Sequence, residues 1–305
     1  MRVVFMGTPA FAVPSLRMLH ERHEVVAVYT RPDAVSGRGR LVSPSPVKVL
    51  ADDLRLPGAQ PATLREPDQV AALAALSPDL IAVAAYGLLL PEPVLSAARM
   101  GCVNVHASLL PRWRGAAPIE RAILAGDRRT GVSIMRMERG LDTGPFATQV
   151  EVDVDGKTTE GLSEELGRAG ADALSGVIDA WESASVVWTP QDESRATYAE
   201  KITAADVKLD PLMSTVDAER RVRAASRHAP SRVVIGERVV SLLAVRVSSR
   251  ALGPGLAACH VGLTLGMADG ALEVLELVPA GRSRMNAADF TRGAHLADTC
   301  AWGPA

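Results

Sequence analysis

The chain opens with a strand–turn–helix–strand order, and this order limits the fold more than any other feature of the sequence. Residues 2–6 (RVVFM) form a short apolar run that ends in a turn at residues 7–9. Apolar side chains with helical spacing follow at residues 10–20, and residues 25–29 form a second run rich in β-branched side chains. Since this order is typical of the start of a doubly wound α/β sheet, we expect a Rossmann-like domain.

The first turn of the expected sheet differs from a dinucleotide-binding turn. It reads GTPAFA from Gly7 onwards and holds one glycine, whereas the dinucleotide fingerprint needs three. A nicotinamide cofactor is therefore not expected. The three cysteines, Cys102, Cys259 and Cys300, lie far apart without zinc-site spacing, so the sequence predicts three reduced thiols and no metal site.

Hydrophobic residues make up 48% of the chain, which is enough for a sizeable core. No apolar run reaches the roughly 18 residues of a membrane span. The chain begins directly with a strand-like run, so we expect no signal peptide, no membrane partner and a cytoplasmic location. The formal net charge of −2 neither favours nor excludes a nucleic-acid partner, so any basic surface for RNA must be local.

The pattern of apolar and polar residues changes in the last third of the sequence. Residues 190–208 are polar, and beyond them come short β-rich runs separated by Gly, Pro and Ser. Such spacing is typical of a small β-barrel. We therefore predict an α/β domain over residues 1–189, a linker over residues 190–208 and a C-terminal β-barrel domain over residues 209–305.

Residues 101–146 hold the candidate catalytic side chains. The run CVNVH alternates apolar and polar residues, so an extended chain places Asn104 and His106 on one face. A glycine-rich turn surrounds Asp142 further along. If folding gathers the three side chains, the imidazole could move protons, the carboxylate could orient it, and the amide could donate to an oxyanion.

A covalent enzyme intermediate is not expected at this site. Ser108 lies two residues after His106, but no G-x-S-x-G elbow surrounds it. An acyl group would therefore pass directly to an incoming nucleophile.

Each of these features also has a purely structural explanation. The Asn, His and Asp could be satisfied by main-chain hydrogen bonds in a strand and a turn. The polar loop at residues 31–46 could offer Arg38 and Arg40 to phosphates, or only to solvent. Residues 86–90 follow a buried-strand pattern and could form a pocket wall or ordinary core.

Residues 104–115 (NVHASLLPRWRG) resemble the signature of the folate-dependent formyltransferases. Residues 108–119 (SLLPRWRGAAPI) resemble, more closely, the methionyl-tRNA formyltransferase family. Shorter matches extend this resemblance over essentially the whole chain and in the right order: FMGTP from Phe5, GRG from Gly37, AYG from Ala85, GLDTG from Gly140, TYAEKI from Thr197 and PAGR from Pro279.

The resemblance implies a role for individual residues. The family's catalytic Asn, His and Asp correspond to Asn104, His106 and Asp142. Its folate-contacting residues correspond to Ser108, Leu109, Leu110 and Pro111, with pterin-pocket main chain around Tyr86, Gly87 and Leu88. Its tRNA-binding cations correspond to Arg38, Arg40 and Lys201, and its C-terminal domain is an OB-like barrel that grips the tRNA.

One segment departs from the family pattern. Residues 222–235 stand where the family commonly has an aromatic- and proline-rich segment. The departure leaves a cluster of arginines that faces either phosphates or solvent: Arg220, Arg221, Arg223, Arg227 and Arg232.

The activity that the resemblance implies is transfer of a formyl group from 10-formyltetrahydrofolate to the amino group of methionyl initiator tRNA, in translation initiation. No metal or nicotinamide would take part, and a monomer is expected. The nearest alternative is a folate-dependent enzyme that formylates an amino-sugar nucleotide. Two further alternatives are an RNA-binding protein with an idle pocket and a nicotinamide dehydrogenase.

Overall fold

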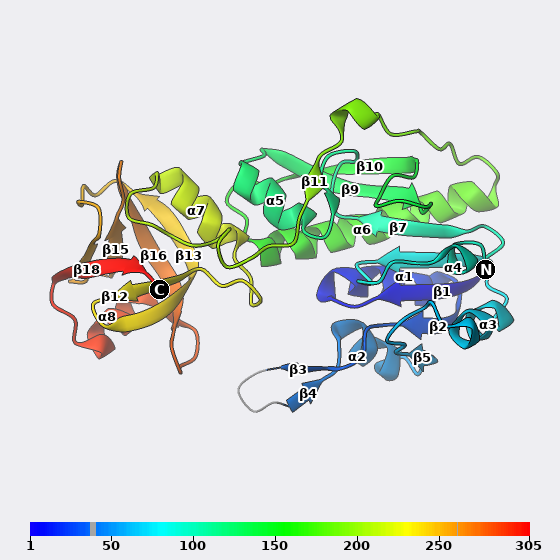
Figure 1. Cartoon of the computed structure of the whole chain (residues 1–305), viewed down its shortest axis with the longest axis horizontal. Coiled ribbons are helices and arrows are strands. Elements are labelled where there is room, and N and C mark those ends of the chain that lie inside the picture. Colours follow the sequence, from blue (N-terminus) through cyan, green and yellow to red (C-terminus); the bar gives the residue numbers. More distant parts are fainter. Residues whose placement is uncertain (37–40, 261) are drawn as a thin grey trace. The chain divides into compact units, whose positions relative to one another are not determined.

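A computed structural model of the chain describes residues 1–36, 41–260 and 262–305. The described residues form two compact units, coloured mainly blue to green and yellow to red in Figure 1. The first unit comprises Met1–Gly115, Arg129–Asp153 and Ser163–Ala199, and the second comprises Ala116–Arg128, Val154–Leu162 and Glu200–Ala305. The division into 1–189, 190–208 and 209–305 stays a prediction about independently folding parts.

The first unit is built on a twisted sheet whose described strands follow the order β10-β9-β7-β6-β1-β2-β5. The strands from β7 to β5 run parallel to their neighbours, whereas β9 and β10 are antiparallel additions at one edge. The predicted Rossmann-like fold is thus confirmed. The strands are β1 (Arg2–Gly7), β2 (Glu24–Tyr29), β5 (Gly58–Ala59), β6 (Leu80–Ala84), β7 (Cys102–His106), β9 (Arg129–Arg136) and β10 (Phe146–Asp153).

Short-range sequence signals explain where the helices of this unit begin. Ser45 precedes α2, and its side chain accepts a hydrogen bond from the Lys48 N–H at 3.1 Å, with Pro46 in the first helical position. The helices are η1 (Ala10–Ala12), α1 (Val13–Arg22), α2 (Pro46–Asp53), α3 (Pro67–Ala75), α4 (Glu92–Leu95), α6 (Thr159–Glu182, from Ser163 onwards) and η2 (Glu193–Arg195). Two small strand pairs complete the unit: β3 (Ala34–Ser36) with β4 (Leu41–Ser43), and β8 (Arg114–Gly115) with β11 (Tyr198–Ala199).

Helix α6 packs directly on strand β7 and thereby decides which face of the strand carries the site. A Cβ atom on Gly170 of α6 would lie 2.5 Å from a methyl carbon of Val105, so only glycine allows this approach. Because side chains alternate along a strand, Val105 points to the helix while Asn104 and His106 point to the opposite face.

The second unit contains a closed barrel. Its described strands follow the order β13-β12-β18-β14-β15-β16, and β16 pairs with β13 to close the ring, while β17 adds to β16. The barrel class agrees with the OB-like prediction. Closure satisfies the strand edges, as barrels require. The strands are β12 (Arg232–Ile235), β13 (Arg238–Ser248), β14 (Leu256–Ala258), β15 (Leu263–Gly266), β16 (Ala271–Pro279), β17 (Met285–Asn286) and β18 (Thr299–Pro304).

Aliphatic side chains fill the barrel, with Trp302 and Phe290 as the aromatic members of the buried cluster. The indole N–H of Trp302 donates to the Gly266 carbonyl at 3.1 Å, which satisfies its one buried donor. The helices of this unit are α5 (Pro118–Ala125), α7 (Thr215–Ala224) and α8 (Ala287–Ala294). No helix in the described part of either unit is both long and apolar enough to span a bilayer.

Candidate active site

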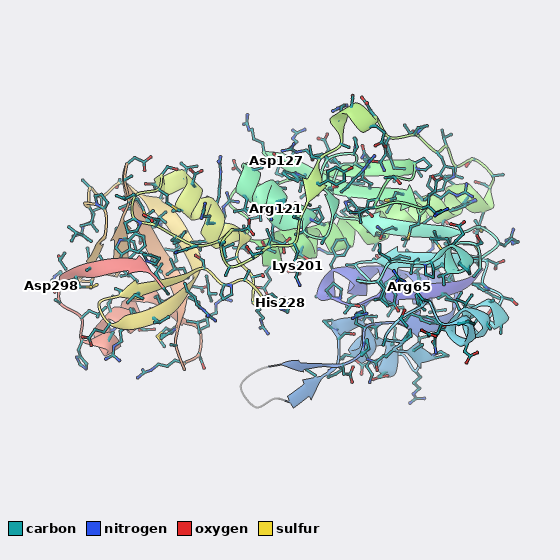
Figure 2. The ribbon with its side chains drawn as sticks, viewed as in Figure 1. Arg65, Arg121, Asp127, Lys201, His228 and Asp298 are labelled. Carbon is teal, nitrogen blue, oxygen red and sulfur yellow. The ribbon has the colours of Figure 1, made fainter. Side chains whose placement is uncertain are left out.

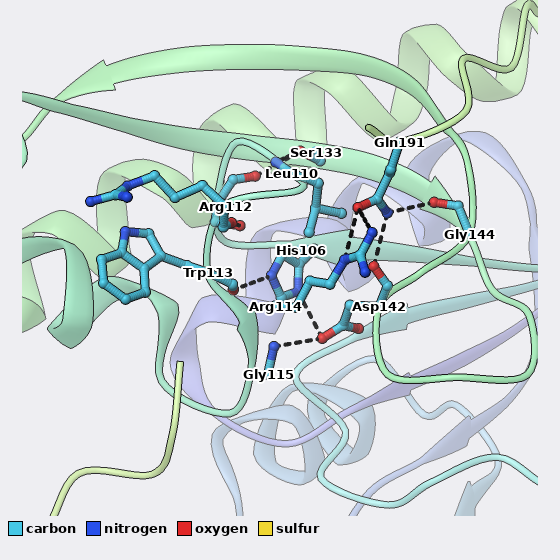
Figure 3. Close-up of polar contacts among 11 residues, drawn as sticks. His106, Leu110, Arg112, Trp113, Arg114, Gly115, Ser133, Asp142, Gly144 and Gln191 are labelled. Atoms are coloured by element: carbon cyan, nitrogen blue, oxygen red, sulfur yellow. Dashed lines mark hydrogen bonds and ion pairs between the residues drawn. The ribbon is translucent and has the colours of Figure 1, made fainter. Parts of the chain in front are cut away.

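His106 and Asp142 meet on the face of strand β7 opposite helix α6 (Figure 3). The segment between β9 and β10 folds back, so that Asp142 Oδ2 lies 3.7 Å from His106 Nδ1. The His106 side chain is 5% exposed and that of Asp142 is 14% exposed. Asn104 lies two residues before His106 on the same face and is half-buried. The structure therefore gathers the predicted His and Asp, with the Asn beside them on the strand.

The hydrogen bonds of His106 decide which of its nitrogens is available. His106 Nε2 lies 3.0 Å from the carbonyl oxygen of Trp113. A carbonyl only accepts, so Nε2 carries a hydrogen, and in a neutral ring Nδ1 is then the acceptor. The 3.7 Å gap between Nδ1 and Asp142 is longer than a hydrogen bond. Nδ1 is thus the atom of this ring that can exchange a proton beside a carboxylate.

Asp142 is held in a backbone conformation that few residues adopt. Its φ is +54°, in the left-handed region, which Asp tolerates better than most side chains. Asp142 Oδ2 accepts a hydrogen bond from the Gly115 N–H at 2.9 Å, and the Asp142 carbonyl accepts one from Gln191 Nε2 at 2.8 Å. Side chain and main chain of Asp142 are therefore both fixed from outside its own turn.

Arg114 is a fully buried cation behind this turn. Its Nε and Nη2 donate to Gln191 Oε1 at 3.0 and 2.8 Å, and Nη1 and Nη2 donate to the two carboxylate oxygens of Glu193 at 2.8 and 2.7 Å. Hydrogen bonds from Arg114 lower the pKa of Glu193, as expected for a carboxylate held by a guanidinium.

The predicted folate segment, residues 108–111, is anchored on strands β9 and β10 by hydrogen bonds. Figure 3 shows Leu110 of this segment and Ser133 of β9. Ser133 Oγ donates to the Ser108 carbonyl at 2.6 Å and accepts from the Leu110 N–H at 3.0 Å. Gln149 Nε2 donates to the Leu110 carbonyl at 2.9 Å and to Ser133 Oγ at 2.8 Å. The segment is thus held by a small, buried polar network.

The side chains of this segment mostly make contacts within the protein. The Ser108 hydroxyl is buried and donates to the Arg112 carbonyl at 2.6 Å, and Leu110 is buried. Leu109 packs over Gly131, where a Cβ atom would lie 2.5 Å from a Leu109 methyl carbon. Leu110 and Pro111 are joined by a cis peptide bond.

In the second segment predicted to contact folate, residues 86–88, the Tyr86 ring lies in the core. Tyr86 is 2% exposed and packs in the core of the sheet domain, and burial raises the pKa of its hydroxyl to about 12. Its carbonyl accepts from Thr8 Oγ1 at 3.0 Å, and Gly87 has a φ of +85°. Leu88 is half-buried beside them. Because β6 and β7 are parallel, this turn and residues 108–111 lie at the same edge of the sheet.

Of the predicted tRNA-binding cations, Arg38 and Arg40 lie outside the described residues. Lys201 has an exposed side chain in the second unit. Arg121 of α5 holds the segment that carries it: Arg121 donates to the Glu200 carbonyl at 3.0 Å and forms an ion pair with Asp206 at 2.9 Å. Figure 2 labels both Arg121 and Lys201.

The arginine cluster around α7 is partly structural. Arg223 is 11% exposed; it donates to Glu219 at 2.6 Å and to the Lys157 carbonyl at 3.1 Å. Arg221 donates to the Lys208 carbonyl at 2.6 Å. The sequence left phosphate and solvent as the alternatives for this cluster, and Arg223 follows neither, because it binds carbonyl groups of its own unit.

Sequence reasoning missed the residues that support the site, namely Ser133, Gln149, Gln191 and the buried role of Arg114. Ser133, Gln149 and Gln191 stand in no motif that distinguishes them from surface residues, and the signature run that contains Arg114 assigns this residue no role. Gln191 even falls in the stretch that the sequence predicts to be a linker. Their only common signal is tertiary, because each bonds a partner far along the chain.

Two surface hollows among the described residues lie away from this site. One of about 560 Å³ is lined by residues at the start of β1 and the end of α1, including Arg2 and His20. The other, of about 400 Å³, runs between β10 and α6. Neither is lined by His106 or Asp142. Among the residues that the structure describes, no group of His, Cys, Asp or Glu is arranged to hold a metal ion.

Comparison with known proteins identifies the family. Residues 1–178 match the family model described as formyl transferase, and residues 201–295 match its C-terminal domain. The methionyl-tRNA formyltransferase of Methylococcus capsulatus is 46% identical over 302 residues, covering 97% of this chain and 98% of that protein.

Solved structures agree on the fold. HypX from Aquifex aeolicus, in complex with tetrahydrofolic acid, superposes with a TM-score of 0.68 at 18% identity; the match covers 95% of this chain but only 46% of HypX. A methionyl-tRNA formyltransferase from Clostridium thermocellum superposes with a TM-score of 0.55 at 14% identity, over 82% of this chain and 94% of that chain. With both formyl transferase models matched and a full-length relative at 46% identity, the chain belongs to the methionyl-tRNA formyltransferase family.

Proposed function

We propose that this protein transfers a formyl group from 10-formyltetrahydrofolate to the free amino group of methionyl initiator tRNA. The observation that carries the proposal is the contact between His106 Nδ1 and Asp142 Oδ2, on the same strand face as Asn104. The acceptor is chosen because a methionyl-tRNA formyltransferase is 46% identical to this chain over 97% of its length. HypX, which shares the fold, binds tetrahydrofolic acid, and this supports the choice of donor.

The residues at this edge of the sheet fit a folate. The turn at Tyr86 and the segment at residues 108–111 are each fixed by side-chain hydrogen bonds from Thr8, Ser133 and Gln149. Fixed main-chain groups of this kind suit the hydrogen-bonding edge of a pterin ring. Formylfolate would supply the formyl group.

His106 has the proton-transfer role in this proposal. An α-amine has a pKa of about 8, so at neutral pH most of it is protonated and cannot attack a carbonyl. His106 Nδ1 can accept the amine's proton because Nε2 is already committed to the Trp113 carbonyl. No hydrogen bond between Nδ1 and Asp142 has to break first, and the carboxylate then stabilises the charged ring.

Asn104 and the protonated His106 would stabilise the negative charge on the formyl oxygen as the amine nitrogen adds to the formyl carbon. The bond from that carbon to the folate nitrogen then breaks, and the proton held by His106 goes to the departing nitrogen. The amine nitrogen, now part of a formamide, releases its second proton to water. Removal of one such oxyanion donor costs on the order of 100-fold to 1,000-fold in turnover in other enzymes.

The test is turnover of charged initiator tRNA by variants of the site. His106→Ala and Asp142→Asn should each lower kcat by orders of magnitude and leave folate affinity nearly unchanged, because neither side chain is needed to bind the pterin. His20→Ala, exposed on α1, is a matched control that should behave as the parent.

Near-normal turnover in either variant would contradict the roles assigned here. An aminated sugar nucleotide, assayed beside the tRNA, addresses the alternative acceptor. Formylation of that nucleotide but not of the tRNA would replace the proposed substrate.

A further inference from the structure

We propose that Gln191 is a positioning residue for the reaction: its side-chain amide holds the Asp142 turn against His106, and Arg114 fixes the direction of that amide. The inference rests on the proposed function, since it gives Gln191 a role only through Asp142. All of these residues belong to the first unit.

Gln191 bridges two kinds of partner (Figure 3). Its Nε2 donates to the Asp142 carbonyl at 2.8 Å and to the Gly144 carbonyl at 2.6 Å. Its Oε1 accepts from Arg114 Nε at 3.0 Å and from Nη2 at 2.8 Å. Every hydrogen-bonding group of the amide therefore has a partner, and two of those partners lie on the turn that carries the catalytic carboxylate.

The polarity of these partners permits only one direction of the amide. A guanidinium can only donate, so the oxygen of Gln191 must face Arg114. The nitrogen must then face the carbonyls of Asp142 and Gly144, which can only accept. A carboxylate at position 191 could satisfy Arg114 but not the carbonyls, and an amine could do the reverse. Glutamine is the side chain of this length that does both.

Arg114 connects this bridge to the carboxylate as well. The residue after it is Gly115, whose N–H donates to Asp142 Oδ2 at 2.9 Å. Arg114 thus holds Gln191 with its side chain, while its neighbour in the chain holds the carboxylate. These two consecutive residues thus fix both parts of Asp142: Arg114 fixes its main chain through Gln191, and the Gly115 N–H fixes its carboxylate.

The turn needs such support because of its conformation. Asp142 has a φ of +54°, and Gly144 packs so closely that a Cβ atom would lie 1.9 Å from the Arg136 carbonyl oxygen. Sparsely populated backbone conformations persist only when their surroundings hold them. Without the two bonds from Gln191, the turn would relax, and the carboxylate would move relative to His106 Nδ1.

The decisive variant is Gln191→Glu. It keeps the length of the side chain and the contact with Arg114, but it places an acceptor against two carbonyl oxygens. Supporting residues of this kind typically change activity by about 10- to 100-fold. We expect kcat to fall by about that factor, with KM for tRNA and for formylfolate unchanged within about 2-fold, because the inference gives Gln191 a role through Asp142 and none in binding substrate. Gln69→Glu on α3 introduces the same charge away from the site and should leave kcat at the parent value.

A double-mutant cycle separates positioning from a general structural role. In an Asp142→Asn background, where the carboxylate is already lost, Gln191→Glu should cause no further loss of kcat. A merely structural defect would lower kcat by the same factor in both backgrounds. If Gln191→Glu does not fold, Gln191→Ala takes its place in the same cycle, since it removes both donors and leaves the carbonyls open to water.

The outcomes distinguish this inference from the proposed function. Full activity of Asp142→Asn overturns the proposed role of Asp142 and this inference with it. A strongly impaired Asp142→Asn together with a fully active Gln191→Glu overturns the inference alone. So does a Gln191→Glu loss that persists undiminished in the Asp142→Asn background.

Discussion

A single buried hydroxyl, that of Ser133, organises the segment predicted to bind folate. It donates to the Ser108 carbonyl and accepts from the Leu110 N–H and from Gln149 Nε2. Ser15, on α1, is equally buried, yet its Oγ has no hydrogen-bond partner among the described residues. Both serines are fully buried, but they differ in the number of hydrogen bonds that their hydroxyls make.

Removal of the Ser133 hydroxyl should therefore destabilise the fold, whereas removal of the Ser15 hydroxyl should not. Ser133→Ala leaves the buried Leu110 N–H and Ser108 carbonyl without their hydrogen-bond partner. It should therefore lower the free energy of unfolding by about 1–3 kcal/mol. Ser15→Ala removes an unpaired buried hydroxyl and improves helix propensity, so it should be neutral or stabilising by up to about 1 kcal/mol.

Urea unfolding followed by tryptophan fluorescence measures both variants, because Trp113, Trp181 and Trp188 all lie in the first unit. Ser15→Ala serves as the control for Ser133→Ala. Equal destabilisation of the two variants would contradict the hydrogen-bond argument.

Among the elements, the short pairing of β8 with β11 is the one that brings a distant segment to the site. Tyr198 and Ala199 pair with Arg114 and Gly115, and the Thr197 carbonyl accepts from the Arg114 N–H at 2.8 Å. Gly115 has a φ of +118°, and a Cβ atom there would lie 2.9 Å from the Ala199 carbonyl oxygen. Only glycine allows this pairing while its N–H faces Asp142.

Gly115→Ala should therefore damage both stability and turnover. The strained φ and the close carbonyl together should cost about 1–3 kcal/mol of unfolding free energy. Displacement of the Gly115 N–H should also lower kcat, because Asp142 Oδ2 loses its donor. Gly58→Ala in β5 is the matched control, since a Cβ atom there meets nothing within 4 Å. Parent-like unfolding and turnover in Gly115→Ala would refute this account of the pairing.

At the scale of the whole molecule, both units contain carboxylates that are stabilised in their charged form. The main-chain N–H of Arg2 lowers the pKa of Asp79 in the first unit. The main-chain N–H and the hydroxyl of Thr215 lower the pKa of Asp269 in the second unit, at the start of α7. A lowered pKa means that folding favours the unprotonated form.

Both units should therefore lose stability in acid. Well above the unfolded pKa of about 3.9, these carboxylates are charged in both the folded and the unfolded chain, and their stabilisation is complete. As the pH falls below about 5, the unfolded chain binds protons first, and the stabilisation is lost once the pH has passed through the lowered folded pKa values. Urea midpoints at pH 7 and pH 3 measure this loss, and Asp269→Asn should reduce the pH dependence of the second unit. A second unit whose pH dependence is unchanged by Asp269→Asn would contradict the assignment.

Local patterns in the sequence determined the classes of both units. The strand–turn–helix–strand order predicted the Rossmann-like sheet, and the evenly spaced short strands predicted the barrel; both predictions are confirmed. The alternation in CVNVH likewise predicted that Asn104 and His106 share a face, because the side-chain period of a strand is fixed by backbone geometry. These properties depend only on residues close together in the chain.

Only the tertiary structure determines which residues hold the site in place. Gln191 reaches Asp142 across 49 positions of sequence, and Arg114 reaches Glu193 across 79. A stretch as polar as the one around Gln191 reads as a linker, because exposed and buried polar residues have the same local pattern. Whether a given polar residue is buried depends on which distant donors and acceptors need a partner in the packed chain. Such long-range hydrogen bonds leave no periodic pattern in the sequence.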